Sequence, residues 1–208
     1  MTSAVMMHIV DNAAVIEVDN PPVNALSFAV RSGLQTTLRE AEHNEAVDAI
    51  VLSCRGNTFI AGADITEFGK PMQPPALPDL LSEMDTLTKP MVAALHGTAL
   101  GGGLEVALTC HYRVALESAK VGLPEVLLGI LPGAGGTQRL PRIAGVELAL
   151  DMITSGRKVS SKEAAKAGLI DKVVSDDLQN AAIAFAKEVV SNQAPLRRIS
   201  ELTATASD

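Results

Sequence analysis

The sequence predicts a layered α/β fold in which buried strands alternate with helices. Short apolar runs such as residues 49–53 and 91–95 have the length and composition of buried strands. Helix-start residues and glycines separate these runs. Strand–strand–helix units also recur at a spacing of about forty residues without any repeat of sequence, which favours a wound α/β layer structure.

The first half of the chain is expected to open with two strands and a helix. Residues 6–10 and 14–18 are typical of strands that flank a turn at Asp11 and Asn12. Ser27 is a typical N-cap, and we expect its helix to run to about residue 43. The next elements expected are a strand at 49–53, a glycine-containing loop at 56–69, an irregular proline-rich segment at 69–78 and a helix at 79–88.

The second half is expected to alternate strands with shorter helices. Gly168 is predicted to end one of these helices, because glycine readily adopts the left-handed backbone found just past a helix end. The expected strands are 91–95, 112–116 and 173–174, and the expected helices are 102–110, 133–143, 146–155, 161–167 and 177–190. Residues 1–198 are predicted to form one domain, followed by a polar tail at 199–208.

Composition excludes several classes of protein. A hydrophobic fraction of 47% is enough to build a core, which aliphatic residues must fill because aromatic residues make up only 2%. The net charge of −7 argues against a nucleic-acid-binding surface. The apolar stretch 91–108 is interrupted by His96, glycines and Glu105, which argues against a membrane span. The first basic residue is Arg31, so no targeting signal is recognised, and we expect a cytoplasmic protein whose two cysteines are reduced.

Two glutamates stand next to motifs that suit proton transfer. Glu105 follows three consecutive glycines that open a predicted helix, and such a helix start exposes N–H groups that can hold a developing oxyanion. Glu125 follows Pro124, a pair that also fits an ordinary helix start. The four histidines show no metal spacing, and no nucleophile motif is present. A pair of general acid/base carboxylates is therefore the chemistry that these residues favour.

These motifs together resemble the crotonase, or enoyl-CoA hydratase/isomerase, superfamily, and in particular the hydratase/isomerase part of multifunctional β-oxidation enzymes. The resemblance runs from about Val15 to Arg198 and is carried by residues 59–65, 96–105 and 124–139. It implies a spiral of ββα turns with a helical C-terminal segment, and a chain that ends before the last helices of such domains. It implies that Glu105 and Glu125 are catalytic and that the N–H groups of Ala63 and Gly102 form an oxyanion hole. The substrate-binding or CoA-binding residues implied are Phe59, Ile60, Ala61, Gly62, Asp64, Gly101 and Gly133; Asp64 as a purely structural cap and Gly133 as a simple turn residue stay open.

The reaction that the resemblance implies is the hydration of a trans-2-enoyl-CoA thioester, with isomerisation of the double bond as a second activity. It requires no metal and no redox cofactor, since coenzyme A is part of the substrate. The partners expected are the acyl-CoA substrate and either further copies of the chain in a trimer-based oligomer or a fused or associated 3-hydroxyacyl-CoA dehydrogenase. The alternatives are a non-catalytic module that binds acyl-CoA or a partner, and a fragment of a hydratase/dehydrogenase.

Overall fold

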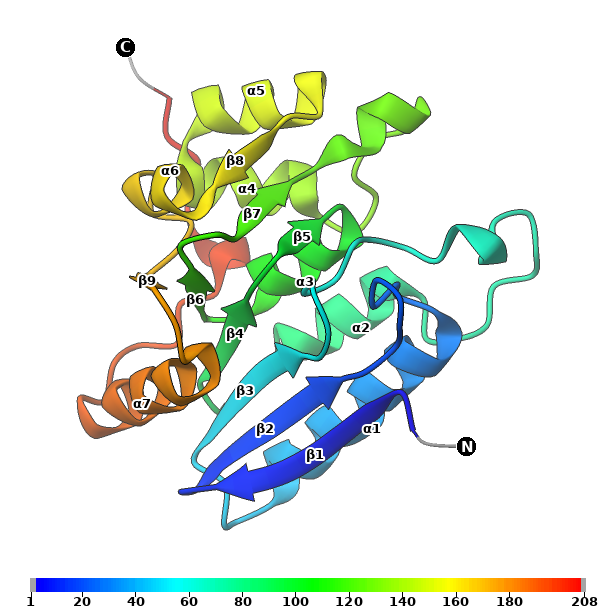
Figure 1. Cartoon of the computed structure of the whole chain (residues 1–208). Helices are drawn as coiled ribbons and strands as arrows, with labels where there is room; N and C mark the ends of the chain where they lie inside the picture. Colours follow the sequence, from blue (N-terminus) through cyan, green and yellow to red (C-terminus); the bar gives the residue numbers. More distant parts are fainter. Residues whose placement is uncertain (1–2, 207–208) are drawn as a thin grey trace.

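The computed structural model describes residues 3–206, and its largest element is a six-stranded sheet with the strand order β1-β2-β3-β4-β6-β9 (Figure 1). The first two strands are antiparallel, and every later neighbour is parallel. The antiparallel pair therefore closes one edge of an otherwise parallel sheet. The strands are β1 (Val5–Val10), β2 (Ala13–Val18), β3 (Ala49–Cys54), β4 (Met91–Leu95), β6 (Tyr112–Leu116) and β9 (Lys172–Val174).

Helices cover both faces of this sheet, which explains why its central strands are apolar throughout. Alternate residues of β2 point to opposite faces: Ala14 and Ile16 join the core beneath α1 (Phe28–His43), whereas Ala13 and Val15 join the core beneath α7 (Leu178–Ser191). Figure 1 shows these two helices on opposite sides of the sheet. The core on the α1 side also includes α2 (Leu77–Met84) and α3 (Gly102–Thr109).

A second sheet of three strands lies next to the first. Its order is β5-β7-β8, with β5 (Thr98–Leu100) parallel to β7 (Lys120–Gly122) and β8 (Lys158–Ser160) antiparallel to it. Three helices pack around this layer at the top of Figure 1: α4 (Gly136–Ala144), α5 (Val146–Ser155) and α6 (Ser161–Lys166). The layered α/β architecture predicted from the sequence is confirmed.

Several element boundaries differ from those predicted. The helix expected to start after the prolines begins earlier, at Leu77, because Pro78 lies in its first turn, where a missing N–H costs nothing. The helix expected from Gly133 begins at Gly136, because Gly135 is left-handed with φ +104 and caps the helix. Ser27 caps α1 as predicted, accepting a hydrogen bond from Val30 N at 3.4 Å. Gly168 follows α6 with φ +79, also as predicted.

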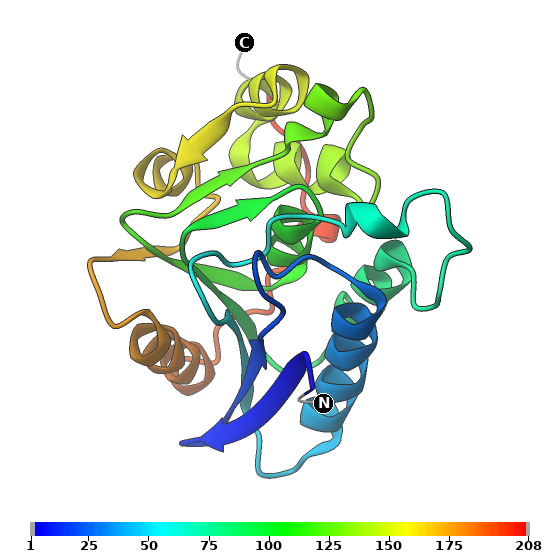
Figure 2. The same cartoon turned by 45° about the vertical axis from the view of Figure 1, so that its right-hand side comes forward.

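The segment between β3 and α2 contains one 3₁₀ turn, η1 (Ile65–Glu67), and otherwise no regular structure. In Figure 2, the part of this segment from η1 onward is the loop that extends away from the body of the molecule. A second 3₁₀ turn, η2 (Pro124–Leu128), follows β7. These two irregular segments and the starts of α2 and α3 surround the cavity described below. Within residues 3–206, no helix is long and apolar enough to cross a membrane.

The predicted polar tail is partly integrated into the fold. A short 3₁₀ turn, η3 (Ile199–Glu201), places Ile199 in the main core, where it is 1% exposed. Val146 N donates a hydrogen bond to Thr205 O at 3.0 Å. The domain boundary at residue 198 stays a prediction, but Ile199 is packed as a core residue rather than as part of a solvated tail.

Candidate active site

A cavity of about 370 Å³ lies between the η1 and η2 segments and the starts of α2 and α3. Most of its surface is apolar, and two carboxylates, Glu105 and Glu125, border it. The structure thus brings together residues that lie far apart in the sequence. The predicted site residues that line this cavity are Ala61, Gly62, Ala63, Gly101, Gly102, Glu105, Glu125 and Gly133.

Glu105 is held rigidly in the first turns of α3. Glu105 is only 2% exposed. Its Oε1 accepts hydrogen bonds from Ala134 N at 2.7 Å and Gly136 N at 2.8 Å. Within residues 3–206, no hydrogen bond occupies Oε2. Burial raises the pKa of Glu105, although the two N–H donors and the nearby Arg139 act in the opposite direction. One oxygen is therefore fixed by the protein and the other is free for a ligand or water.

Glu125 is half-buried on η2 and is held more loosely. Its Oε2 is buried and has no hydrogen-bond partner within residues 3–206. A methyl group added at Gly101 would lie 3.2 Å from its Oε1, so the glycine leaves room for this carboxylate. Burial raises the pKa of Glu125, and the negative charge of Glu105 raises it further. A buried oxygen without a partner is costly unless a ligand or water satisfies it, which is typical of a functional group.

Two backbone N–H groups border the same cavity without a hydrogen-bond partner in the described chain. Gly102 is the first residue of α3, where N–H groups lack a helical partner. Ala63 follows Gly62, whose carbonyl accepts from Leu26 N at 2.9 Å and so fixes the loop, while Ala63 N itself stays unbonded. A Cβ built on Gly102 would lie 3.7 Å from Ala63 N, which places the two groups side by side. Together they form a pair of donors suited to a developing oxyanion.

Glycine is required where α3 begins. A side chain at Gly102 would meet Leu77 Cδ2 at 2.9 Å and Leu26 Cδ1 at 3.0 Å. At Gly103, it would meet Ile60 O at 2.2 Å, a clash with backbone that cannot turn aside. The glycine run therefore allows the start of α3 to approach the 60–63 backbone closely, and that approach brings the two N–H groups together.

Three predicted binding residues do not line this cavity. The side chains of Phe59 and Ile60 are fully buried in the core, and their backbone groups bond to His96 O and Leu100 N, both at 3.0 Å. Asp64 caps η1, its Oδ1 accepting from Thr66 N at 2.9 Å, and hydrogen bonding by the side chain and then by the N–H of Thr66 lowers the pKa of its carboxyl. These contacts give all three a structural role. Their contact with coenzyme A stays a prediction.

One polar residue of the site was not predicted. Arg139, one turn into α4, donates to Ala134 O at 3.1 Å and pairs with Asp85 Oδ2 at 2.5 Å. It therefore braces the same loop whose N–H groups hold Glu105. The one signal for Arg139 in the sequence is its position in the helix that follows the glycine turn. Nothing in the sequence indicates that its partner is Asp85, at the end of α2. The other apolar lining residues that were not predicted are Ile65, Phe68, Leu128, Ile130 and Leu131.

Comparison with known proteins agrees with this geometry. The chain is 48% identical over 192 residues to the peroxisomal bifunctional enzyme of Danio rerio and 47% identical over 187 residues to that of Homo sapiens. It spans only 27% and 26% of the length of these relatives, while 92% and 89% of this chain is covered.

Solved structures share the fold over most of the chain. An enoyl-CoA hydratase from Bacillus anthracis superposes with a TM-score of 0.84 at 35% identity, covering 91% of this chain and 77% of that one. DspI from Pseudomonas aeruginosa superposes with a TM-score of 0.85 at 31% identity, covering 93% of this chain and 77% of that one.

The fold and the paired glutamates beside two backbone donors define a protein of the crotonase class. Residues 8–207 match the sequence family described as enoyl-CoA hydratase/isomerase. The chain belongs to this family, and the predicted resemblance is confirmed.

Proposed function

We propose that this chain catalyses the addition of water to a trans-2-enoyl-CoA thioester, giving a 3-hydroxyacyl-CoA, in fatty-acid β-oxidation. The observation that carries the proposal is that Glu105 and Glu125 border one cavity together with the unbonded N–H groups of Ala63 and Gly102. Membership of the enoyl-CoA hydratase/isomerase family supports the reaction class. The mostly apolar wall of the cavity suits an acyl chain.

The reaction follows from the charges that develop during hydration. As the oxygen of water bonds to C3, one glutamate removes a proton from the water and the electron pair moves toward the thioester carbonyl. The N–H groups of Ala63 and Gly102 stabilise that oxyanion, and a second carboxyl group then supplies the proton at C2 as the carbonyl re-forms. The mechanism needs no metal and no redox cofactor.

The same groups would allow a proton to move between C2 and C4, so we propose double-bond isomerisation as a second activity. We also propose that the chain works as a homo-oligomer or beside a 3-hydroxyacyl-CoA dehydrogenase. The names of the curated relatives place those proteins in peroxisomes. A cytoplasmic location for this chain therefore stays a prediction that localisation of the tagged protein would decide.

Hydration of crotonyl-CoA, followed by loss of the enone thioester absorbance, tests the proposal directly. Changing Glu105 or Glu125 to Gln keeps the shape of the side chain but removes proton transfer, so each variant is expected to lower kcat by roughly 10²–10⁴-fold. The double variant should lose less than the product of the two single losses, because both groups act on one water and one substrate. A chain that binds acyl-CoA but shows no turnover would favour a non-catalytic binding module instead.

A further inference from the structure

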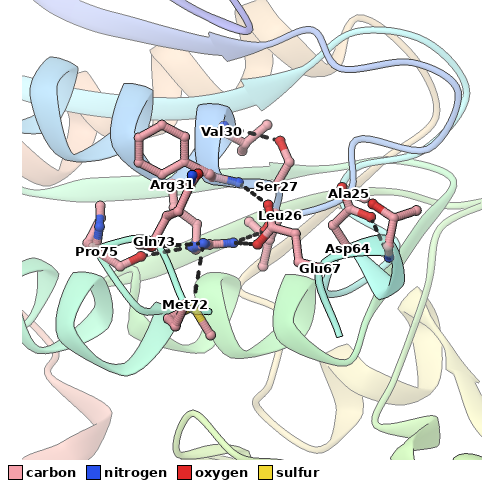
Figure 3. A network of polar contacts seen from close by, with 12 residues as sticks. Ala25, Leu26, Ser27, Val30, Arg31, Asp64, Glu67, Met72, Gln73 and Pro75 are labelled. Atoms are coloured by element: carbon pink, nitrogen blue, oxygen red, sulfur yellow. Dashed lines mark hydrogen bonds and ion pairs between the residues drawn. The ribbon is translucent and has the colours of Figure 1, made fainter. Parts of the chain in front are cut away.

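Arg31 is a buried arginine on α1 whose guanidinium is used entirely within the protein. The residue is 4% exposed. Its Nε donates to Pro75 O at 2.8 Å, and one terminal nitrogen donates to Leu26 O at 2.6 Å. The same nitrogen pairs with Glu67 at 2.8 Å, and the other donates to Gln73 O at 3.2 Å (Figure 3). The guanidinium therefore links α1 to the η1 turn and to the stretch at Gln73 and Pro75 just before α2.

Glu67 provides a second link between the same parts. One oxygen of this carboxylate accepts from Arg31, and the other accepts from Phe28 N at 2.6 Å, at the start of α1. Charge-assisted hydrogen bonds of this kind are stronger and more directional than neutral ones. The η1 turn is thus fixed to the start of α1 by both oxygens of the Glu67 carboxylate.

The segment held by Arg31 and Glu67 supplies one wall of the active-site cavity. Ile65 and Phe68 line that cavity, as do Leu77 and Pro78 at the start of α2. Apolar packing contributes little to holding this segment, because Ile65 is 69% exposed, Phe68 is 57% exposed and Met72 is 65% exposed. Met72 itself lies against the guanidinium, with its Sδ 3.7 Å from the Arg31 side chain. A segment with few buried contacts depends on its polar anchors for order.

We infer that Arg31 is a positioning residue which, with Glu67, holds the η1 wall in place and so determines how well the site binds long acyl chains. The inference rests on the proposed function and deepens it. A wall that is already ordered spares an acyl chain the entropic cost of ordering it on binding. A long chain contacts more of this wall than a short one, whereas both react at the same glutamates and N–H groups.

Two variants separate this role from a general loss of structure. Arg31→Lys keeps the charge but loses the planar fork, and Glu67→Gln keeps the shape but loses the ion pair. For both, we expect the KM for trans-2-dodecenoyl-CoA to rise about ten-fold, the loss that corresponds to ordering one or two side chains on binding. The KM for crotonyl-CoA and the kcat for both substrates should stay within about two-fold of the values for the unmutated chain. A raised KM with an unchanged kcat is the result expected when a variant loses binding of the substrate that is equal in the ground state and the transition state.

Arg39→Gln is the matched control, because Arg39 lies on the same helix and pairs with Glu83 of α2 but does not touch the η1 segment. It should leave the ratio of the two KM values unchanged. Equal losses for short and long substrates in the Arg31 and Glu67 variants, or the same change of ratio in the Arg39 variant, would overturn the inference.

Hydrogen exchange of the unmutated chain keeps the inference testable if the variants fold poorly. Dodecanoyl-CoA should slow exchange of the amides in residues 65–76 more than butyryl-CoA does, and Arg31→Lys should speed exchange there when it folds. If dodecanoyl-CoA leaves these amides unchanged, the inference is wrong. Both probes are saturated and cannot be hydrated, so this result is independent of whether the chain turns over crotonyl-CoA.

Discussion

Glu105 and Glu125 border one cavity but are held in different ways. Two N–H donors bind Glu105, whereas a buried oxygen of Glu125 has no partner within the described chain. Burial raises the pKa of both carboxyls, and their mutual repulsion adds to the rise at Glu125. Environments that differ in this way are what allows two glutamates to act as base and acid in one reaction.

The raised pKa of Glu125 predicts a stability cost at neutral pH. The folded protein binds a proton at Glu125 more tightly than the unfolded chain does, so the free energy of unfolding falls as pH rises through the raised pKa. Glu125→Gln should therefore raise the free energy of unfolding at neutral pH, on the order of 1 kcal/mol, while hydration is lost. The gain should disappear below the ordinary pKa of glutamate. Urea unfolding at neutral and acid pH measures both; an unchanged free energy at neutral pH would contradict the prediction.

Arg139 is expected to contribute to the pH dependence of Glu105, together with burial and the two N–H donors. The charged groups that act on Glu105 are Arg139, which lowers its pKa, and Glu125, whose repulsion is mutual. Arg139→Gln should raise the pKa of Glu105, so the acid limb of the kcat/KM profile moves to higher pH and activity is lost first at acid pH.

Two further variants control for structural damage at Arg139. Arg139→Lys keeps the charge and should preserve the position of the acid limb, although it loses the fork that contacts Ala134 and Asp85. Adding Asp85→Asn to Arg139→Gln removes the carboxylate that would otherwise be left unpaired. An acid limb that stays in place in Arg139→Gln would show that the arginine is only structural.

The sequence singled out residues that line the candidate cavity, but not the residues that hold them in place. Glu105, Gly102 and Ala63 lie in recognisable local motifs, and the structure brings them to one cavity. Arg31 and Arg139 were not predicted, because their partners are distant and in part backbone carbonyls. Arg139 pairs with a residue 54 positions away, and Arg31 bonds to a carbonyl 44 positions away. A local sequence pattern cannot predict such contacts, because every residue has a backbone carbonyl that could accept the hydrogen bond.

At the scale of elements, the approach of α3 to the 60–63 backbone depends on Gly103. An alanine Cβ there would lie 2.2 Å from Ile60 O, so Gly103→Ala must displace the helix start. We expect a loss of about 3 kcal/mol or more in the free energy of unfolding, as for severe overpacking. Gly133→Ala is the matched control: its Cβ would meet nothing within 4 Å, and its effect should stay within about 0.5 kcal/mol. Urea unfolding of both variants decides; equal stability of the two would mean that the close approach is absent.

Long apolar or capped elements were predictable, and so was the short strand β9, which overlaps the strand predicted at 173–174; the three short strands of the second sheet were not. The strands β3 and β4 and the Ser27-capped α1 carry strong local signals, and all three were predicted. The strands β5, β7 and β8 were missed, because each has only three residues and exists through pairing with the others. Pairing across distant segments is a tertiary effect, which outweighs the propensity of three residues.

At the scale of the whole molecule, large apolar side chains gather outside the core near the cavity. Leu127 is 71% exposed, Leu128 is 68% exposed and Leu131 is 69% exposed, all within five residues of chain. Leu128 and Leu131 also line the cavity, whereas Leu127 does not. Such concentrations of exposed apolar surface are typical of interaction sites. Since a self-complementary surface is the commonest route to soluble oligomers, a second copy of the chain is the partner we expect.

Self-association of the chain should therefore depend on Leu127. Light scattering or sedimentation is expected to report species larger than a monomer that dissociate on dilution. Leu127→Gln should shift the equilibrium toward the monomer by about ten-fold or more, the effect of removing one well-buried interface leucine. Because Leu127 does not line the cavity, the variant should still bind acyl-CoA. Ile9→Gln is the matched control: Ile9 is 44% exposed on the edge strand β1, and its replacement should leave association unchanged. A clean monomer at all concentrations, or equal effects of the two variants, would show that the η2 surface is not where copies meet.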